Sequence, residues 1–207
     1  MPENLHKLFV ISSPSGGGKT SLINKLFEDS RSANFEKSIS DTSRQKREGD
    51  LEGKDYYFLS EKDFKDKIKK EEYVEYAIVF GNFYGTSKKE IKTKYNNSNL
   101  ILELDWQGAY AVKELFDDAK LIFLVPPSLD DLKQRLIKRN LDSFESIENR
   151  LSEAKKEISK SEIYDYLVLN DDFDKAFEDL SQILFEGISP IDFNSRASKD
   201  LIKRLVE

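Results

Sequence analysis

A glycine-rich segment directly follows the first apolar run of the chain. The segment SSPSGGGKT (12–20) comes after KLFVIS (7–12), a short β-branched run typical of a buried parallel strand, and before TSLINKLFEDS (20–30), whose apolar residues share one helical face. Strand, glycine loop and helix in this order form the setting in which backbone N–H groups and a helix N-terminus bind phosphate. The order predicts a phosphate-binding loop. The alternative is a flexible turn with a solvated lysine.

The loop departs from the pattern G-x-x-x-x-G-K-[ST] at one position, where Ser13 replaces the first glycine. Because Ser13 precedes Pro14, its backbone is pushed into the extended region, which serine occupies without strain. The substitution should therefore be harmless. The N–H groups of Gly16, Gly17 and Gly18 are expected to point at phosphate oxygens.

The two residues after the glycines carry side chains suited to a nucleotide. Lys19 would reach the β- and γ-phosphates, and the Thr20 hydroxyl would hold Mg²⁺. A loop of this kind alone is shared by GTPases, ATPases and small-molecule kinases, so it does not choose among them.

The composition restricts the class of protein. A chain of 207 residues with 38% hydrophobic residues can build one globular α/β domain with insertions. A net charge of -6 argues against a broad nucleic-acid interface, and the lack of cysteine with a single histidine leaves no zinc cluster or disulfide framework. No apolar stretch is long enough for a membrane span and no signal peptide is evident, so we expect a cytoplasmic protein.

Three further apolar runs, each followed by a helical pattern, continue the alternation of strand and helix. The strand candidates and their helices are 99–104 with 107–116, 120–127 with 129–139, and 164–170 with 173–185. This alternation predicts a parallel sheet flanked by helices, the arrangement of P-loop NTPases, with ligands at the carboxyl ends of the strands.

Two segments interrupt the alternation. Residues 38–87 hold a strand-like YYFL, a helix expected after the N-cap Ser60, and a strongly aromatic run, so they read as a mixed α+β insertion with its own small sheet. Residues 128–160 are helical and highly charged, which fits either a mobile lid or an ordinary solvated helical hairpin. The remaining core is expected to comprise 1–37, 88–127 and 161–207. Within the insertion, the aromatic side chains expected to form its core are Tyr73, Tyr76, Phe80 and Phe83.

Arginine is scarce and unevenly placed. Eight of the 33 basic residues are arginine, and five of them lie in the two segments that interrupt the alternation: Arg44, Arg47, Arg135, Arg139 and Arg150. Arginine binds phosphate through a planar fork that lysine lacks, so two clusters beside a phosphate loop suit a reaction between two phosphorylated ligands. For any one of these arginines taken singly, the alternative is a surface residue without a role in phosphate binding.

At this point the sequence resembles the guanylate kinases, which transfer phosphate from ATP to GMP. The resemblance covers nearly the whole chain and rests on an ordered set of motifs: SSPSGGGKTSL, S-x-x-x-R-x-x-R, EGDLEGKDYYF, EEYVEYAIVFGNFYGTS, ILELDWQG, LVPPSLDDLKQRL and VLNDDFDKA. It implies a core with a parallel sheet, a GMP-binding insertion and a helical lid. It departs from the family at Ser13, at Lys46, at Thr86 and at RNLD (139–142), where Asn140 can still adopt the left-handed turn usual for glycine.

The resemblance also implies a role for each matching residue. The expected ATP-binding residues are Ser13, Pro14, Ser15, Gly16, Gly17, Gly18, Lys19, Thr20 and Asn170, with Mg²⁺ on Thr20. The expected GMP-phosphate residues are Arg44, Arg47, Tyr56 and Tyr84, and the expected guanine-reading residues are Ser40, Glu75, Thr86 and Asp105. For Asn170 the alternative is a strand-ending turn and helix cap.

The chemistry of guanine agrees with the guanine-reading set. Carboxylates at Glu75 and Asp105 match the N1 and N2 donors of guanine, while a hydroxyl of Ser40 or Thr86 can serve O6. Adenine would place the lone pair of its N1 against a carboxylate, and this mismatch strongly disfavours adenine relative to guanine. The alternative for Glu75 is an outward-facing residue on an alternating strand.

The expected reaction needs no general base, because the GMP phosphate, with a second pKa near 6, already offers an anionic oxygen. Catalysis is then positioning and charge neutralisation by Lys19, Arg44, Mg²⁺ and the lid residues Arg135, Arg139 and Arg150, which we expect to complete the site on closure and exclude water. The alternatives are a non-catalytic guanylate-kinase-like binding module and a phosphate-loop enzyme acting on another nucleotide. The partners are ATP and GMP, and the sequence allows a monomer or a homo-oligomer.

Overall fold

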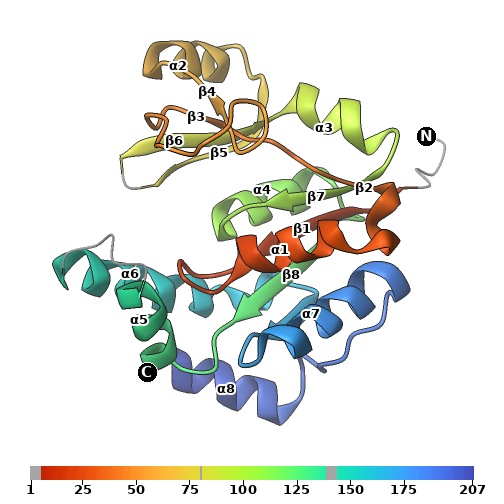
Figure 1. The fold of residues 1–207 in the computed structure, drawn as a ribbon, viewed down its shortest axis with the longest axis vertical. Coiled ribbons are helices and arrows are strands. Elements are labelled where there is room, and N and C mark those ends of the chain that lie inside the picture. Colours follow the sequence, from red (N-terminus) through yellow and green to blue (C-terminus); the bar gives the residue numbers. More distant parts are fainter. Residues whose placement is uncertain (1–5, 80, 139–143) are drawn as a thin grey trace. The chain divides into compact units, whose positions relative to one another are not determined.

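The chain divides into two compact units, whose elements are labelled in Figure 1. The computed structural model describes residues 6–79, 81–138 and 144–207. The first unit comprises residues up to 8 together with 34–119, and the second comprises 9–33 together with 120–207. This division splits the expected core between the two units, with residues 38–87 in the first and 128–160 in the second, and the three-part arrangement stays a prediction.

The strands of the second unit are parallel and almost entirely buried. β1 (Leu8–Ser12) pairs with β8 (Lys120–Val125), and β8 pairs with β9 (Tyr166–Leu169). Every residue of β1 is buried, and so is every residue of β8 except Lys120. Strands without an exposed face indicate a sheet covered by helices on both sides, which confirms the predicted fold class.

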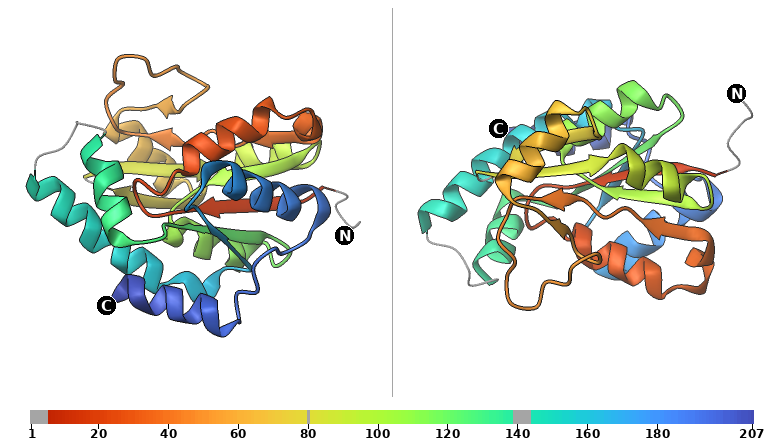
Figure 2. Two further views of the ribbon diagram at one scale, coloured as in Figure 1. Left: turned by 60° about the horizontal axis from the view of Figure 1, so that its bottom comes forward. Right: turned by 90° about the horizontal axis from the view of Figure 1, so that it is seen from above.

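The helices of the second unit follow the predicted segments. They are α1 (Lys19–Glu28), α5 (Leu129–Lys138), α6 (Phe144–Ser159), α7 (Phe173–Ser181), which continues as a π-helical turn Gln182–Glu186, and α8 (Arg196–Val206). The predicted charged pair is therefore present as α5 and α6. The amphipathic tail forms α8, which packs along α6 (Figure 2).

The first unit contains a short parallel pair and a separate small sheet. β2 (Phe35–Lys37) pairs in parallel with β7 (Asn99–Glu103), and the Leu100 N–H donates to the Lys7 carbonyl at 2.9 Å. The small sheet has the order β4-β3-β6-β5, built from β4 (Tyr57–Phe58), β3 (Asp41–Thr42), β6 (Asn82–Ser87) and β5 (Tyr73–Val79). The sequence predicted a small sheet here.

Helices α2 (Glu61–Lys69) and α4 (Trp106–Leu115) lie on opposite faces of the small sheet (Figure 1). Ser60 caps α2 by accepting from the Asp63 N–H at 3.1 Å, as predicted. Helix α3 (Lys88–Tyr95) was not predicted from the sequence. Only Ile91 and Tyr95 are buried in it, so the sequence has too few apolar residues at helical spacing to indicate a helix.

The aromatic residues of the insertion only partly form its core. Phe64 of α2 stacks on Tyr73 with ring centroids 4.5 Å apart and contacts Phe83 at 5.3 Å. The prediction that Tyr76 belongs to this core is wrong, because Tyr76 is 50% exposed. Phe80 lies outside the described residues.

None of the helices in the described ranges is long and apolar enough to cross a membrane.

Candidate functional site

The glycine loop joins β1 to α1 through two glycines in the left-handed conformation. Gly16 and Gly18 have φ of 89° and 93°, the left-handed region that glycine adopts without strain. The Gly17 N–H donates to the Pro14 carbonyl at 2.8 Å, which closes the turn. The φ of Ser13 is not positive, so serine can occupy the position of the missing glycine without backbone strain.

Asn170 braces this loop from the end of β9. Its side-chain Nδ2 donates to the Gly17 carbonyl at 2.7 Å, and its own N–H donates to the Val125 carbonyl at 2.9 Å. A side chain at Gly18 would collide with this amide. Asn170 is only 3% exposed, so its observed contact is with the loop backbone, and its expected contact with ATP stays a prediction. The cap of α7 is Asp172, which accepts from the Lys175 N–H.

Two of the arginines expected in a lid also lie at the loop. Arg135 of α5 donates from Nη2 to the Asn170 carbonyl at 2.7 Å, and Arg150 of α6 donates from Nη1 to Ser15 Oγ at 3.4 Å. These contacts link α5 to the end of β9 and α6 to the loop. Arg139 and the turn at Asn140 lie outside the described residues.

Lys19 and Thr20 open α1 directly after the left-handed Gly18. Lys19 is half-buried and Thr20 is exposed. The first N–H groups of a helix lack partners within the helix, so this end attracts phosphate oxygens. The expected ATP residues of the loop, together with Asn170, Arg135 and Arg150, thus lie in the second unit.

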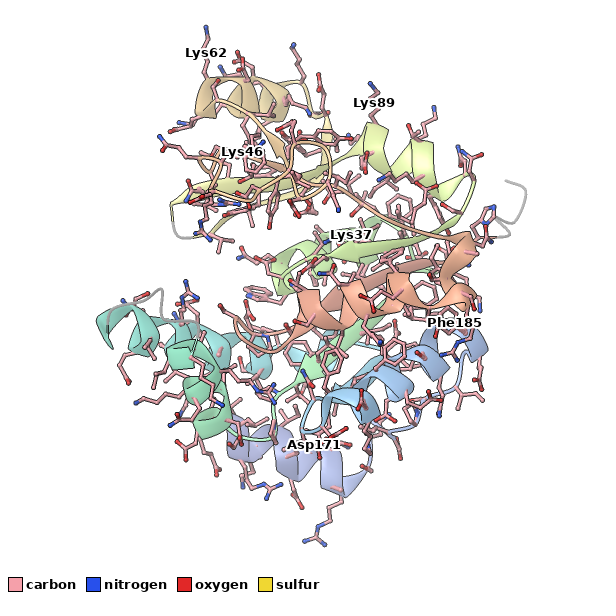
Figure 3. The ribbon with its side chains drawn as sticks, viewed as in Figure 1. Lys37, Lys46, Lys62, Lys89, Asp171 and Phe185 are labelled. Atoms are coloured by element: carbon pink, nitrogen blue, oxygen red, sulfur yellow. The ribbon has the colours of Figure 1, made fainter. Side chains whose placement is uncertain are left out.

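A second cluster of expected residues lies wholly in the first unit and surrounds Arg44. The Arg44 guanidinium lies 5.5 Å from the Tyr56 ring centroid and 5.6 Å from that of Phe58, and Tyr56 meets Tyr84 edge-on at 5.7 Å. The Arg44 side chain is only 12% exposed. By contrast, Lys62 of α2 and Lys89 of α3 point away from the strands into solvent (Figure 3).

Asp50, which was not predicted from the sequence, connects the two arginines. Asp50 Oδ2 accepts from Arg44 Nη2 at 2.9 Å and from the Arg47 N–H at 2.8 Å. The Arg47 N–H and then the Arg44 guanidinium hold the pKa of Asp50 below its ordinary value. The Asp50 carboxylate therefore orients the Arg44 guanidinium and fixes the backbone at Arg47. A carboxylate three residues after Arg47 was the signal available in the sequence.

We expect Asp50→Asn to raise the KM for GMP about three- to tenfold, because a partly exposed ion pair of this kind contributes modestly. The turnover number with saturating GMP should not change. Steady-state kinetics measures both. Asp55→Asn is the matched control, since Asp55 lies in the same segment and accepts from the Leu51 N–H. A lower KM in Asp50→Asn would contradict this role, because Asp50 would then be competing with phosphate for Arg44.

The expected guanine-reading residues meet in the same unit, where a bulge sets the direction of Glu75. On a regular strand Tyr73 and Glu75 would share a face, but the pairing of β5 with β6 shifts register between them. Tyr73 therefore stacks on α2, whereas Glu75 lies against α4. Glu75 is 7% exposed, so it is not the outward-facing residue of the alternative interpretation.

Hydroxyl groups line one side of Glu75. Thr86 is fully buried, faces Glu75 across the strand pair and hydrogen-bonds to its carboxylate. Ser40 Oγ lies 3.3 Å from Thr86 Oγ1. Asp105 caps α4 by accepting from the Gly108 N–H at 2.9 Å. All four residues expected to read guanine thus belong to one cluster.

The electrostatics of Glu75 are unusual for a carboxyl group. Burial raises its pKa from 4.5 to about 7; the bond from Thr86 lowers the pKa, and the nearby charge of Asp105 raises it further. Oε1 of Glu75 has no hydrogen-bond partner within the described part of the chain. A buried acceptor without a partner costs free energy, so this atom is suited to a donor from outside the protein.

Comparison with known proteins identifies the family. The family model described as "Guanylate kinase" matches residues 5–187. The chain is 46% identical over 184 residues to a guanylate kinase of Wolbachia sp. subsp. Brugia malayi, covering 88% of this chain and 93% of that protein. It is 48% identical over 178 residues to a guanylate kinase of Hahella chejuensis, covering 86% and 85%.

A solved structure agrees over nearly the full length. The crystal structure of guanylate kinase from Anaplasma phagocytophilum superposes with a TM-score of 0.72 at 32% sequence identity, and the match covers 99% of this chain and 98% of that one. A glycine loop between β1 and α1 in one unit, and clustered arginines with the buried carboxylate of Glu75 in the other, accompany sequence similarity over most of the chain. The chain belongs to the guanylate kinase family.

Proposed function

We propose that the protein is a cytoplasmic guanylate kinase that transfers the γ-phosphate of ATP to GMP, and to dGMP, giving ADP and GDP in purine nucleotide metabolism. The observation that carries this proposal is the buried carboxylate of Glu75, with Oε1 unpartnered among the described residues and Asp105 nearby. The family relationship supports the same reaction.

Guanine fits the donors and acceptors of this cluster. Its N1 and N2 groups donate, and the carboxylates of Glu75 and Asp105 accept. Its O6 accepts, and the hydroxyls of Ser40 and Thr86 can donate. Adenine presents an acceptor at N1, which would leave the buried Glu75 unpaired; a site built for hydrogen bonding rejects such an analogue strongly.

The remaining residues position the two phosphates. Arg44, Arg47, Tyr56 and Tyr84 would hold the GMP phosphate, whose anionic oxygen is the nucleophile. Lys19 and the loop N–H groups would hold the β- and γ-phosphates of ATP, and Arg135, Arg139 and Arg150 would neutralise the charge of the transferring group. The γ-phosphorus bond to the β-γ bridging oxygen breaks as its bond to the GMP oxygen forms.

A divalent metal, Mg²⁺, is the proposed cofactor. The exposed Thr20 hydroxyl at the start of α1 is an oxygen ligand beside the expected phosphate site. This fits Mg²⁺, which keeps several waters and binds through one or two protein groups and the nucleotide phosphates. The metal would neutralise phosphate charge, and Thr20 would orient it.

The main alternative is a guanylate-kinase-like binding module without catalysis. Retention of Lys19, Thr20 and Arg44 favours the enzyme. The test is a coupled assay of ADP formation with ATP, Mg²⁺ and GMP on the full chain. We expect ADP production that requires both GMP and protein. Binding of GMP with no ADP formed would overturn the catalytic proposal and favour the module.

A further inference from the structure

Both carboxylates of the guanine-reading cluster contact one glycine. Gly108 is the third residue of α4 and is buried. Its N–H donates to Asp105 Oδ1 at 2.9 Å. A β-carbon at Gly108 would lie 3.1 Å from Glu75 Oε2, closer than ordinary van der Waals contact. One backbone position therefore borders both acidic groups.

Backbone conformation does not require glycine here. Gly108 is absent from the residues with positive φ and lies inside a regular helix. Glycine is the least favourable residue in a helix interior apart from proline, and alanine is the most favourable. By helix propensity alone, alanine would be more favourable than glycine at this position. The reason for glycine must lie in the space around it.

That space is closed on two sides. The added β-carbon would lie 3.1 Å from Leu104 Cβ and 3.2 Å from Leu104 Cδ1, in addition to its contact with Glu75. Leu104 is 7% exposed and its Cβ is fixed to the backbone, so on this side the start of α4 would have to give by a few tenths of an ångström. The Glu75 side chain would also have to move, away from the position in which Thr86 holds it.

We propose that Gly108 is a positioning residue for guanine specificity. Its N–H fixes one oxygen of Asp105, and its missing side chain leaves the room in which the Glu75 carboxylate lies. The two carboxylates then face neighbouring donors of one purine edge. This inference rests on the proposed function, because it assigns Gly108 a role only if GMP is the acceptor.

The test compares Gly108→Ala with the wild type in steady-state assays with GMP and with IMP, which lacks the 2-amino group. We expect the KM for GMP to rise about tenfold or more and the GMP-to-IMP ratio of kcat/KM to fall. The KM for ATP should not change, and kcat with saturating GMP should stay within about twofold. Glu114→Ala, on the exposed end of α4, is the control for helix propensity.

A pH profile separates positioning from a general structural defect. The added methyl group would remove further solvent from Glu75 and raise its pKa, so the pH below which the KM for GMP increases should be higher in Gly108→Ala than in the wild type. A double-mutant cycle with Glu75→Gln should show that Gly108→Ala adds little once the carboxylate is gone.

Each failure has its own signature. If the wild type forms no ADP with GMP, the proposed function is wrong. If the wild type is active and Gly108→Ala has an unchanged KM, nucleotide ratio and pH profile, only the positioning role is wrong. If Gly108→Ala does not fold, Glu75→Ala is introduced into both the wild type and Gly108→Ala. A larger rise of the melting temperature in Gly108→Ala than in the wild type supports the role, and an equal rise in both contradicts it.

Discussion

Lys19→Met should lower kcat for ADP formation with GMP by about a hundred- to a thousandfold, the effect expected when one preorganised donor to a developing charge is removed. Lys19 follows Gly18 at the start of α1, where it can reach the bridging and transferred phosphates. The loop N–H groups remain in this variant, so ATP should still bind. The rate of ADP formation measures the loss of kcat, and a titration with ATP measures whether ATP still binds.

Lys25→Met is the matched control. Lys25 lies on the same helix, is exposed and forms an ion pair with Glu28 at 3.5 Å. Its removal should leave kcat unchanged. If Lys19→Met retained a kcat near that of the wild type, the loop would not be handling the transferred phosphate, whatever its resemblance to a phosphate-binding loop.

Glu75→Gln should raise the KM for GMP about a hundredfold, because a hydrogen bond to a buried charge is lost and an amide N–H₂ can then face a donor of guanine. The pKa of Glu75 in the folded protein is about 7, and the carboxylate must be ionised to accept from both guanine donors. In the wild type, the KM for GMP should therefore rise as the pH falls below 7. Since the GMP phosphate also titrates near pH 6, Glu75→Gln supplies the reference profile.

The same substitution should stabilise the protein at high pH. A carboxyl group whose pKa is raised on folding contributes its full stability below its unfolded pKa of 4.5, and that stability is lost as the pH rises through 7. The shift corresponds to about 3 kcal/mol at pH 8. Glutamine carries no such cost, so Glu75→Gln should melt several degrees above the wild type at pH 8, with the difference shrinking toward pH 4.5.

Glu72→Gln, which removes an exposed carboxylate directly before β5, is the control for both measurements. It should change neither the KM for GMP nor the pH dependence of melting. If Glu75→Gln were less stable than the wild type at pH 8, the carboxylate would be compensated within the protein, and the argument for an open acceptor at Oε1 would fail.

Local chemistry explains why the strand, glycine loop and helix at 8–28 were predictable. A β-branched run, three consecutive glycines and an amphipathic segment are adjacent in the sequence, and each needs only its neighbours to adopt its structure. The substitution at Ser13 could also be judged locally, because Pro14 already restricts its backbone.

Other features depend on residues distant in the sequence. The bond from Asn170 to Gly17 joins positions 153 residues apart, so no local pattern indicated that Asn170 would brace the loop. The inward direction of Glu75 depends on a bulge between Tyr73 and Glu75, and a shift of one residue reverses the face that a side chain occupies. The same limitation explains why Tyr76 was wrongly expected in the core.

That the protein is a kinase whose acceptor is GMP can be tested by comparing nucleoside monophosphates as acceptors. Purified full-length protein is assayed with ATP, Mg²⁺ and each of GMP, dGMP, AMP, CMP and UMP, and kcat/KM is determined for each acceptor. A site built on Glu75 and Asp105 predicts values for GMP, then dGMP, that exceed those for AMP, CMP and UMP by at least about a thousandfold. Transfer to AMP equal to or faster than transfer to GMP would contradict the assignment.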